Sequence, residues 1–349
     1  MSTEKIDAHP LKEHNSKLVL STFMAMKTAT RRQLAQRTGL SQPTVNSIVQ
    51  ELEDNGFAKP GKFAASAGGR RPQSYSLQTN HIRAATIRVL KKSLEYVVIT
   101  VDGTVILRNS WAVTNTDTAV TALQALLTRL LKQDRKIRVV SIGVPGVVGP
   151  GGVLHGVPQI PELEGVALIH ELEELFDIPI YIENDMNLVA LGSVTDESVQ
   201  TVSTDMVFVH IGQGVGAGIV MGGKIIRGFS SFAGEIAYMF KPPKNADVEE
   251  TLECLLSQTG SIAKQAELIS GLIVSMICLL NPPVISFGSE YANEELLRHL
   301  RNECEKHLPL WTLPSFQLIP DEDAAYDRGL LALVEDVLIS RITQCIVVA

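Results

Sequence analysis

Two groups of polar side chains in this 349-residue sequence could do chemistry. The first is the pair Asn184 and Asp185 in the run IENDMN, where a carboxylate that follows a buried strand can accept a hydrogen bond or a proton from a hydroxyl group. The second is the pair Arg70 and Arg71 in the loop AGGRRP, where arginines beside glycines can follow the backbone into a DNA groove. The first group suits a small polar ligand and the second a polyanion.

The segment before the arginine loop predicts three short helices. Thr30 is expected to cap the second helix, over residues 31–38, which ends at Gly39. Ser41 is expected to cap the third, with Pro43 tolerated in its first turn. The apolar faces of the first and third helices are Leu18, Val19, Phe23 and Met24, and Val45, Ile48, Val49 and Leu52. Two helices joined by a glycine turn are typical of the helix-turn-helix, whose second helix enters the major groove.

The exposed start of the third helix carries short polar side chains that can read base edges or phosphates. These residues are Ser41, Gln42, Thr44, Asn46 and Ser47. Strands expected near Phe57 and Tyr75 flank the arginine loop as the strands of a wing would, which predicts a winged helix-turn-helix. The alternatives are a small helical hairpin with a polar surface and, for the two arginines, a solvated charge pair.

Charge supports a nucleic-acid partner for this head. Residues 1–80 have a net charge of +5 and residues 81–349 a net charge of −12. The N-terminus lacks the apolar core of a signal peptide, and the apolar stretch at 268–280 is too short and interrupted to span a bilayer. The four cysteines are widely spaced with no CxxC pair, which favours a reducing compartment. We therefore expect a cytoplasmic protein without a membrane partner.

From residue 81 onward, strands alternate with helices, which predicts an α/β body. Asp102-Gly103 is expected to form a hairpin turn, and the glycines at residues 212–218 a loop that turns or approaches a ligand. The expected strands cover residues 84–89, 94–101, 105–110, 139–144, 180–182 and 206–211, and the expected helices cover 119–133, 168–176 and 187–194.

The order of the motifs resembles the ROK family of bacterial repressors and sugar kinases, in its repressor branch, over nearly the whole chain. The motifs are RRQLAQRTGLSQPTVNSIVQELEDNGF and GGRRP in the head, and GVPG, IENDMN, the glycine run, GEIAY and PPVISFG in the body. The resemblance implies a winged helix-turn-helix over residues 1–80 and a two-lobed, actin-like (ribonuclease-H-like) sugar-kinase body over 81–349. Lobe one would comprise about 81–195 with a C-terminal helix at 321–349, and lobe two about 196–320, with sugar and nucleotide bound between them.

The resemblance also implies roles for particular residues. Asp185 stands where the family has its catalytic base, which we expect to be vestigial here. Asn184, Glu235 and Glu253 stand at or near sugar-contacting positions, and Tyr238 replaces a family histidine and could donate a hydrogen bond to a sugar hydroxyl. As alternatives, Asn184 and Asp185 could cap a helix that begins near residue 187, and Tyr238 could be a core tyrosine. Gln159 replaces a family asparagine, which leaves the identity of the sugar open.

Two departures from the family argue against catalysis. Arg88, Leu90 and Lys92 replace the acidic residue, glycine and threonine of the first phosphate loop, so we expect kinase activity to be lost. Arg88, Lys91 and Lys92 are instead expected to form an exposed basic hairpin, or alternatively to hold an anion such as a sugar phosphate. Where the family binds a structural zinc with three cysteines and a histidine, only Cys254 is nearby, so we expect neither zinc nor another cofactor.

Together these observations predict a DNA-binding transcriptional regulator, a repressor of genes for carbohydrate uptake or catabolism. Its partners would be a double-stranded DNA operator, a sugar or sugar-phosphate effector and further copies of itself, as a homodimer or tetramer. Two alternatives remain: an ATP-dependent sugar kinase with an attached DNA-binding head, and a dimerisation and docking module with no sugar site left.

Overall fold

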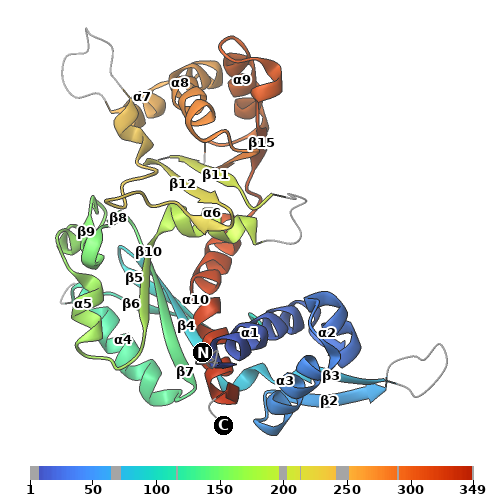
Figure 1. Ribbon diagram of the computed structural model, residues 1–349. Coiled ribbons are helices and arrows are strands. Elements are labelled where there is room, and N and C mark those ends of the chain that lie inside the picture. Colours follow the sequence, from blue (N-terminus) through green and yellow to red (C-terminus); the bar gives the residue numbers. More distant parts are fainter. Residues whose placement is uncertain are drawn as a thin grey trace, which may run out of the picture.

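The computed structural model describes residues 8–63, 72–114, 117–195, 203–212, 214–240, 251–288 and 291–347. The body consists of two β-sheets with their helices, one above the other in Figure 1, and the head, drawn in blue, lies beside the lower one. The sequence prediction of a mixed α/β body behind a helical head is confirmed.

The head contains helices α1 (Ala8–Met26), α2 (Arg31–Thr38) and α3 (Gln42–Asp54) and a sheet in the order β1-β3-β2 (Thr28–Thr30, Gln73–Leu77 and Ala58–Phe63). Thr30 and Gln33 form a reciprocal capping box at the start of α2, and Gly39 ends that helix with a left-handed φ of 71°. Ser41 caps α3 by accepting a hydrogen bond from the Thr44 amide. One expected core residue is wrong, because Leu18 is 36 % exposed and Leu20 is buried in its place.

The lower sheet has the strand order β10-β7-β4-β5-β6, and helices α4 (Ala119–Gln133) and α5 (Leu168–Glu173) contribute to its apolar core. Its strands in chain order are β4 (Arg83–Leu90), β5 (Ser93–Thr100), β6 (Val105–Ala112), β7 (Ile137–Val144) and β10 (Ile180–Asn184). A small separate hairpin joins β8 (Val147–Val148) to β9 (Leu154–His155). The turn at Asp102-Gly103 connects β5 to β6, as expected.

The upper sheet has the order β13-β12-β11-β14-β15 and shares an apolar core with α7 (Leu252–Gln258), α8 (Ile262–Leu280) and α9 (Glu294–Glu305). Its strands are β11 (Met206–Ile211), β12 (Val215–Met221), β13 (Lys224–Ile225), β14 (Val284–Gly288) and β15 (Ser315–Leu318). By length and composition, α8 is one helix in the described part of the chain that could cross a membrane, but its buried residues belong to this core.

Helices α6 (Asp185–Val194) and α10 (Glu322–Val347) connect the two halves of the body (Figure 1). They approach so closely that a Cβ atom added to Gly192 would lie 1.7 Å from the carbonyl oxygen of Ala325. A Cβ on Gly218 of β12 would likewise lie 2.1 Å from the Met186 carbonyl oxygen of α6. Glycine is therefore required at both places, and α6 is held between α10 and the upper sheet.

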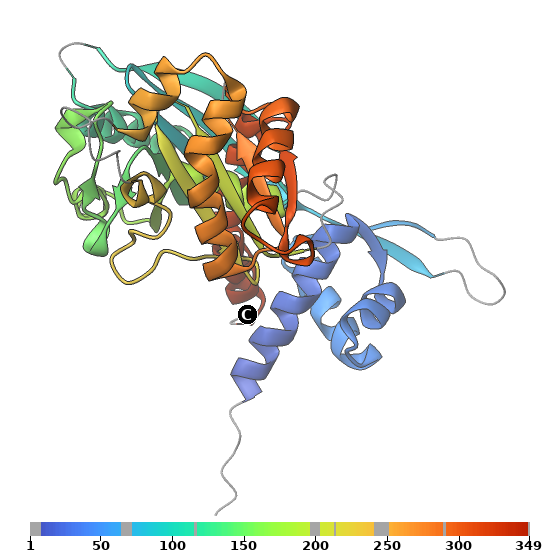
Figure 2. The same ribbon diagram turned by 90° about the horizontal axis from the view of Figure 1, so that it is seen from above.

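The head shares its hydrophobic core with the body. Val19 and Phe23 of α1 belong to one continuous cluster of buried side chains that also contains Val97 of β5 and Leu338 and Ile342 of α10. Figures 1 and 2 show α1 beside the C-terminal half of α10 in both directions of view. Because apolar burial holds the two units together, the head is seated on the body.

Several expected element boundaries are wrong. α6 begins at Asp185 rather than near residue 187, because Asn184 caps it, and β10 extends to that same residue. α5 ends at Glu173 rather than at 176. The glycine run at 212–218 is only partly a loop, because its second half belongs to β12, where Gly218 makes room for α6.

Candidate functional site

The start of α3 presents the predicted DNA-reading side chains on the surface of the head. Gln42, Asn46 and Ser47 are exposed, as is the capping residue Ser41, and Thr44 is half-buried. The hydroxyl groups of Ser41 and Thr44 lie 2.7 Å apart. Arg70 and Arg71 lie outside the described residues, so their place in the wing stays a prediction.

Helix α1 borders this surface, which the sequence analysis missed. Lys12 and Asn15 of α1 line a surface hollow of about 260 Å³ together with Thr44 and Ser47 of α3. Lys12 also forms an ion pair with Glu51, with 3.1 Å between Nζ and Oε1. No sequence motif marks Lys12 and Asn15, because they become neighbours of α3 only when the head folds.

Two of the predicted sugar-binding residues, Asp185 and Glu235, come together in the body. Burial raises the pKa of Asp185 to about 6, although the Met186 amide and the charges of His210 and Arg88 act in the opposite direction. Burial also raises the pKa of Glu235, and the negative charge of Asp185 raises it further. Two carboxyl groups that interact in this way can accept hydrogen bonds from the hydroxyl groups of one small polyol, and Asp185 is suited to take up a proton near neutral pH.

Asn184 acts as a helix cap, as one of the sequence alternatives proposed. Its Oδ1 accepts hydrogen bonds from the amides of Met186, at 2.8 Å, and Asn187, at 3.2 Å. Its Nδ2 donates to the carbonyl oxygen of Gly146 at 2.9 Å. Both ends of the side-chain amide therefore have partners within the protein, and the sugar contact of Asn184 stays a prediction.

An ion pair between the exposed Arg227 and the buried Glu183 was not predicted. The side chain of Glu183 is only 3 % exposed; its Oε2 accepts a hydrogen bond from Arg227 Nε at 2.7 Å and forms an ion pair with Arg227 Nη2 at 2.5 Å. Its Oε1 accepts from the Asn184 amide and from Asn187 Nδ2, both at 2.9 Å. Arg227 lies on the segment that leads to Glu235, so this ion pair ties that segment to the start of α6. Glu183 stands in the IENDMN run, but nothing in the sequence singles out Arg227.

The remaining two predicted sugar residues occupy different environments. Glu253 Oε1 accepts a hydrogen bond from the Val215 amide at 3.2 Å, and thus holds the first residue of β12. Tyr238 is 76 % exposed and its ring centroid lies 5.1 Å from that of Phe232. The alternative of a core tyrosine is therefore wrong.

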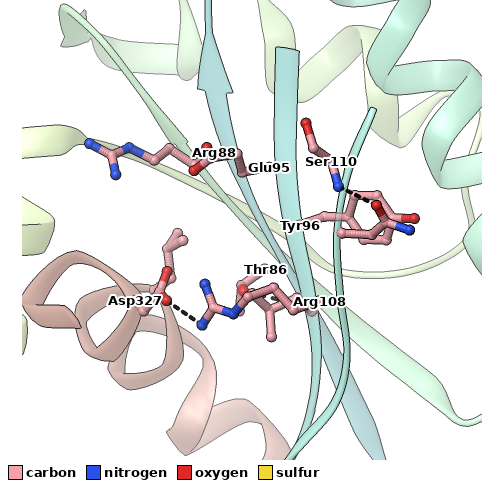
Figure 3. A pocket seen from close by; sticks show the side chains of 10 residues that line it. Thr86, Arg88, Glu95, Tyr96, Arg108, Ser110 and Asp327 are labelled. Carbon is pink, nitrogen blue, oxygen red and sulfur yellow. Dashed lines mark hydrogen bonds and ion pairs between the residues drawn. The ribbon is translucent and has the colours of Figure 1, made fainter. Parts of the chain in front are cut away.

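The expected exposed basic hairpin is wrong for Arg88, although Lys91 and Lys92 are exposed. Arg88 forms an ion pair with Asp323 of α10 and lies over the Tyr326 ring, 4.4 Å from its centroid. It borders a pocket of about 250 Å³ between strands β4 to β6 and α10, shown in Figure 3. There Arg108 reaches across to Asp327, with 2.6 Å between Nη2 and Oδ2. Arg88, which stands in the degenerate phosphate loop, is thus bound to residues of α10.

Among the described residues, the structure places no group of three or more histidine, cysteine or acidic side chains where it could hold a metal ion. Cys254 is half-buried, and its sulfur accepts a hydrogen bond from the side-chain amide of Gln258 at 2.9 Å. The absence of structural zinc stays a prediction, which metal analysis of the purified protein would test.

Comparison with known proteins assigns the family. Residues 85–255 match the ROK family, and residues 15–59 match a winged helix-turn-helix DNA-binding domain. The body of the chain therefore carries a ROK family region. A crystal structure of a ROK family transcriptional regulator, a homologue of the E. coli MLC protein, covers 97 % of this chain and all of that one, with a TM-score of 0.76 and 16 % identity. The ROK hexokinase from Thermus thermophilus covers 72 % of this chain and 97 % of its own, with a TM-score of 0.59 and 18 % identity. These likenesses show the fold: the regulator matches nearly the whole chain, head included, and the hexokinase matches about seven-tenths of it.

Two of the curated relatives that the chain resembles are named as transcriptional regulators. The xylose repressor of Caldicellulosiruptor bescii is 29 % identical over 65 % of this chain and 59 % of its own length. The transcriptional dual regulator NagC of Escherichia coli K12 is 27 % identical over 67 % of this chain and 59 % of its own. The chain thus spans about six-tenths of the length of the curated relatives that it matches.

Proposed function

We propose that this ROK protein is a sugar-responsive transcriptional repressor, which binds operator DNA with its head and a sugar with its body. The observation that carries the proposal is the continuous apolar core joining the helix-turn-helix to α10, in a chain whose α6 begins with the half-buried carboxylate Asp185. Relatives named as xylose and N-acetylglucosamine repressors support a sugar as the effector. The protein would act in the cytoplasm, as a dimer or tetramer, because one short recognition helix reads few base pairs.

A mechanical connection between sugar and DNA follows from the helix contacts. A sugar bound at Asp185 and Glu235 contacts the first turn of α6 and the segment held by Arg227. α6 packs without any intervening side chain on α10 at Gly192, and α10 continues into the core of the head. A sugar that binds one arrangement of these helices more tightly than another would change the position of the paired heads, and thereby the affinity for DNA.

Fluorescence anisotropy tests the proposal. The full chain is titrated onto DNA from upstream of its own gene, with and without a panel of sugars and sugar phosphates. We expect salt-sensitive, sequence-preferring binding that one sugar changes. Asp185→Asn should keep the DNA affinity and weaken the sugar response, whereas Asn46→Ala should lower the DNA affinity and keep the sugar response. No preference for any upstream sequence would contradict the proposal.

One observation favours a second function, that of a sugar kinase. A pKa of about 6 suits Asp185 to take a proton from a sugar hydroxyl, as phosphoryl transfer requires. Against it, Arg88 replaces the acidic residue of the phosphate loop and is paired with Asp323. Coupled measurement of ADP release with a hexose panel decides between the two functions. Release that Asp185→Asn abolishes would establish the kinase, and we expect none.

A further inference from the structure

The segment that carries Glu235 has an unusually apolar surface. Five large apolar side chains are exposed within residues 226–239, and Phe229 is exposed completely. They are Ile226, Phe229, Phe232, Tyr238 and Met239. Single exposed apolar residues are ordinary, but a group on one short segment marks a place where an apolar partner binds.

Phe232 and Tyr238 form one surface next to the carboxyl group of Glu235. Their rings are tilted by 57°, with 5.1 Å between the centroids. The Glu235 amide donates to the Phe232 carbonyl oxygen, and the Tyr238 amide donates to the Glu235 carbonyl oxygen, each at 3.3 Å. The ring pair and the carboxyl group therefore belong to the same tight turn. Glu235 also interacts electrostatically with Asp185, so the turn that carries the ring pair carries one of the two carboxyl groups of the candidate sugar site.

The segment is held in place before the two rings and between them. Before the rings, Arg227 is bound to the buried carboxylate of Glu183. Between the rings, Gly234 lies against β12, where its carbonyl oxygen accepts a hydrogen bond from the Ala217 amide at 2.8 Å. A Cβ atom on Gly234 would lie 2.1 Å from the Ala217 carbonyl oxygen. An apolar surface that is already ordered loses little conformational entropy when a ligand binds to it.

We propose that the effector is a glycoside with a second ring, which stacks on Phe232 and Tyr238 while the hydroxyl groups of its first ring bind Asp185 and Glu235. This inference rests on the proposed sugar-sensing function and specifies its ligand class. A free monosaccharide would leave the ring pair exposed to water. A second ring removes apolar surface from water at no cost in reorganisation of the segment.

Calorimetry with matched ligands tests the inference. The ligands are a monosaccharide that alters DNA binding, its methyl glycoside, its phenyl glycoside and a disaccharide with the same first ring. We expect the phenyl glycoside or the disaccharide to bind about three- to tenfold more tightly than the methyl glycoside, the gain typical of a ring stacked on an aromatic pair. A gain for the phenyl glycoside alone would identify an aromatic second ring, and a gain for the disaccharide alone a sugar ring.

Variants show whether the ring pair is responsible. Phe232→Ala and Tyr238→Ala should each abolish the gain of the phenyl glycoside or disaccharide over the methyl glycoside, whereas Tyr238→Phe should keep that gain. Trp311→Ala removes an exposed aromatic ring from another segment and should change nothing. Equal affinities for all glycosides, or a gain that survives both alanine variants, would overturn the inference while the sugar-sensing function stands. Failure of every sugar to bind the wild type would overturn both.

Discussion

Removing the charge of Asp185 should stabilise the protein at neutral pH. Burial raises the pKa of this carboxyl group to about 6, from 3.8 when it is free in solution. Below pH 3.8 the group is protonated in both the folded and the unfolded state. Between pH 3.8 and 6 only the unfolded state releases the proton, so the free energy of unfolding decreases as the pH rises.

The size of the effect follows from the pKa shift. A shift of about two pKa units corresponds to about 3 kcal/mol, since one unit is about 1.4 kcal/mol at room temperature. Above pH 6 Asp185 is ionised in both states, and the full cost of burying its charge lowers the free energy of unfolding. Asp185→Asn cannot ionise, and its side-chain oxygen can still accept the hydrogen bond from the Met186 amide. The variant should therefore match the wild type near pH 4 and exceed its stability by up to about 3 kcal/mol at pH 7.5.

Urea denaturation of wild type and variant at pH 4, 5, 6 and 7.5 measures this difference directly. The exposed residue Asp177 provides the control, because Asp177→Asn changes the same chemical group on the surface and should give no such pH dependence. A stability difference for Asp185→Asn that does not increase with pH would refute the reasoning, as would a variant less stable than the wild type at pH 7.5.

Three further predictions concern other contacts. Gly192→Ala would place a methyl group against the Ala325 carbonyl oxygen. It should lower the free energy of unfolding by about 1–3 kcal/mol and reduce the effect of sugar on DNA binding. An unchanged sugar effect would show that the α6–α10 contact does not transmit the sugar signal. Arg227→Ala should lower the free energy of unfolding by about 1–3 kcal/mol in urea denaturation, because it leaves the buried Glu183 carboxylate without a cation that is itself 44 % exposed. The double variant with Glu183→Gln should recover part of this loss, and no recovery would mean that the loss is not electrostatic. Asn46→Ala should weaken operator binding by about 1–3 kcal/mol in anisotropy and leave the slope of affinity against salt unchanged; equal weakening on random DNA would make Asn46 a backbone contact.

Local sequence patterns predicted the head well. Caps at Thr30 and Ser41, a stop at Gly39 and a regular apolar face on α3 are all determined by residues within one or two helical turns. The short strand β1 was not expected, because its three residues become a strand only by pairing with β3.

The site was predictable only where its residues stand in a recognisable run. Asp185 and Glu235 were singled out through motifs, and in the structure the charge of Asp185 acts on Glu235; their sugar contact stays a prediction. The partners of Arg88 and Glu183 could not be found in this way, because Asp323 lies 235 positions after Arg88, and Arg227 lies 44 positions after Glu183. Such pairings depend on how the two sheets and α10 come together.

The packing of the head against the body could not be predicted from the sequence either. Val19 and Leu338 each have the apolar character of an ordinary core residue, and nothing in either segment shows that they belong to one cluster. That cluster joins the head to the body, as the proposed coupling requires, and it emerges only from the folded chain.

The coupling itself is tested most directly by reciprocal binding. The affinity of the effector sugar is measured by calorimetry for the free protein and for the protein saturated with operator DNA, and the affinity of DNA is measured with and without saturating sugar. Linkage requires that DNA change the sugar affinity by the same factor, and in the same direction, as sugar changes the DNA affinity. We predict such a matching factor, and it should fall towards one in Gly192→Ala. Identical sugar affinities with and without operator DNA would contradict the account.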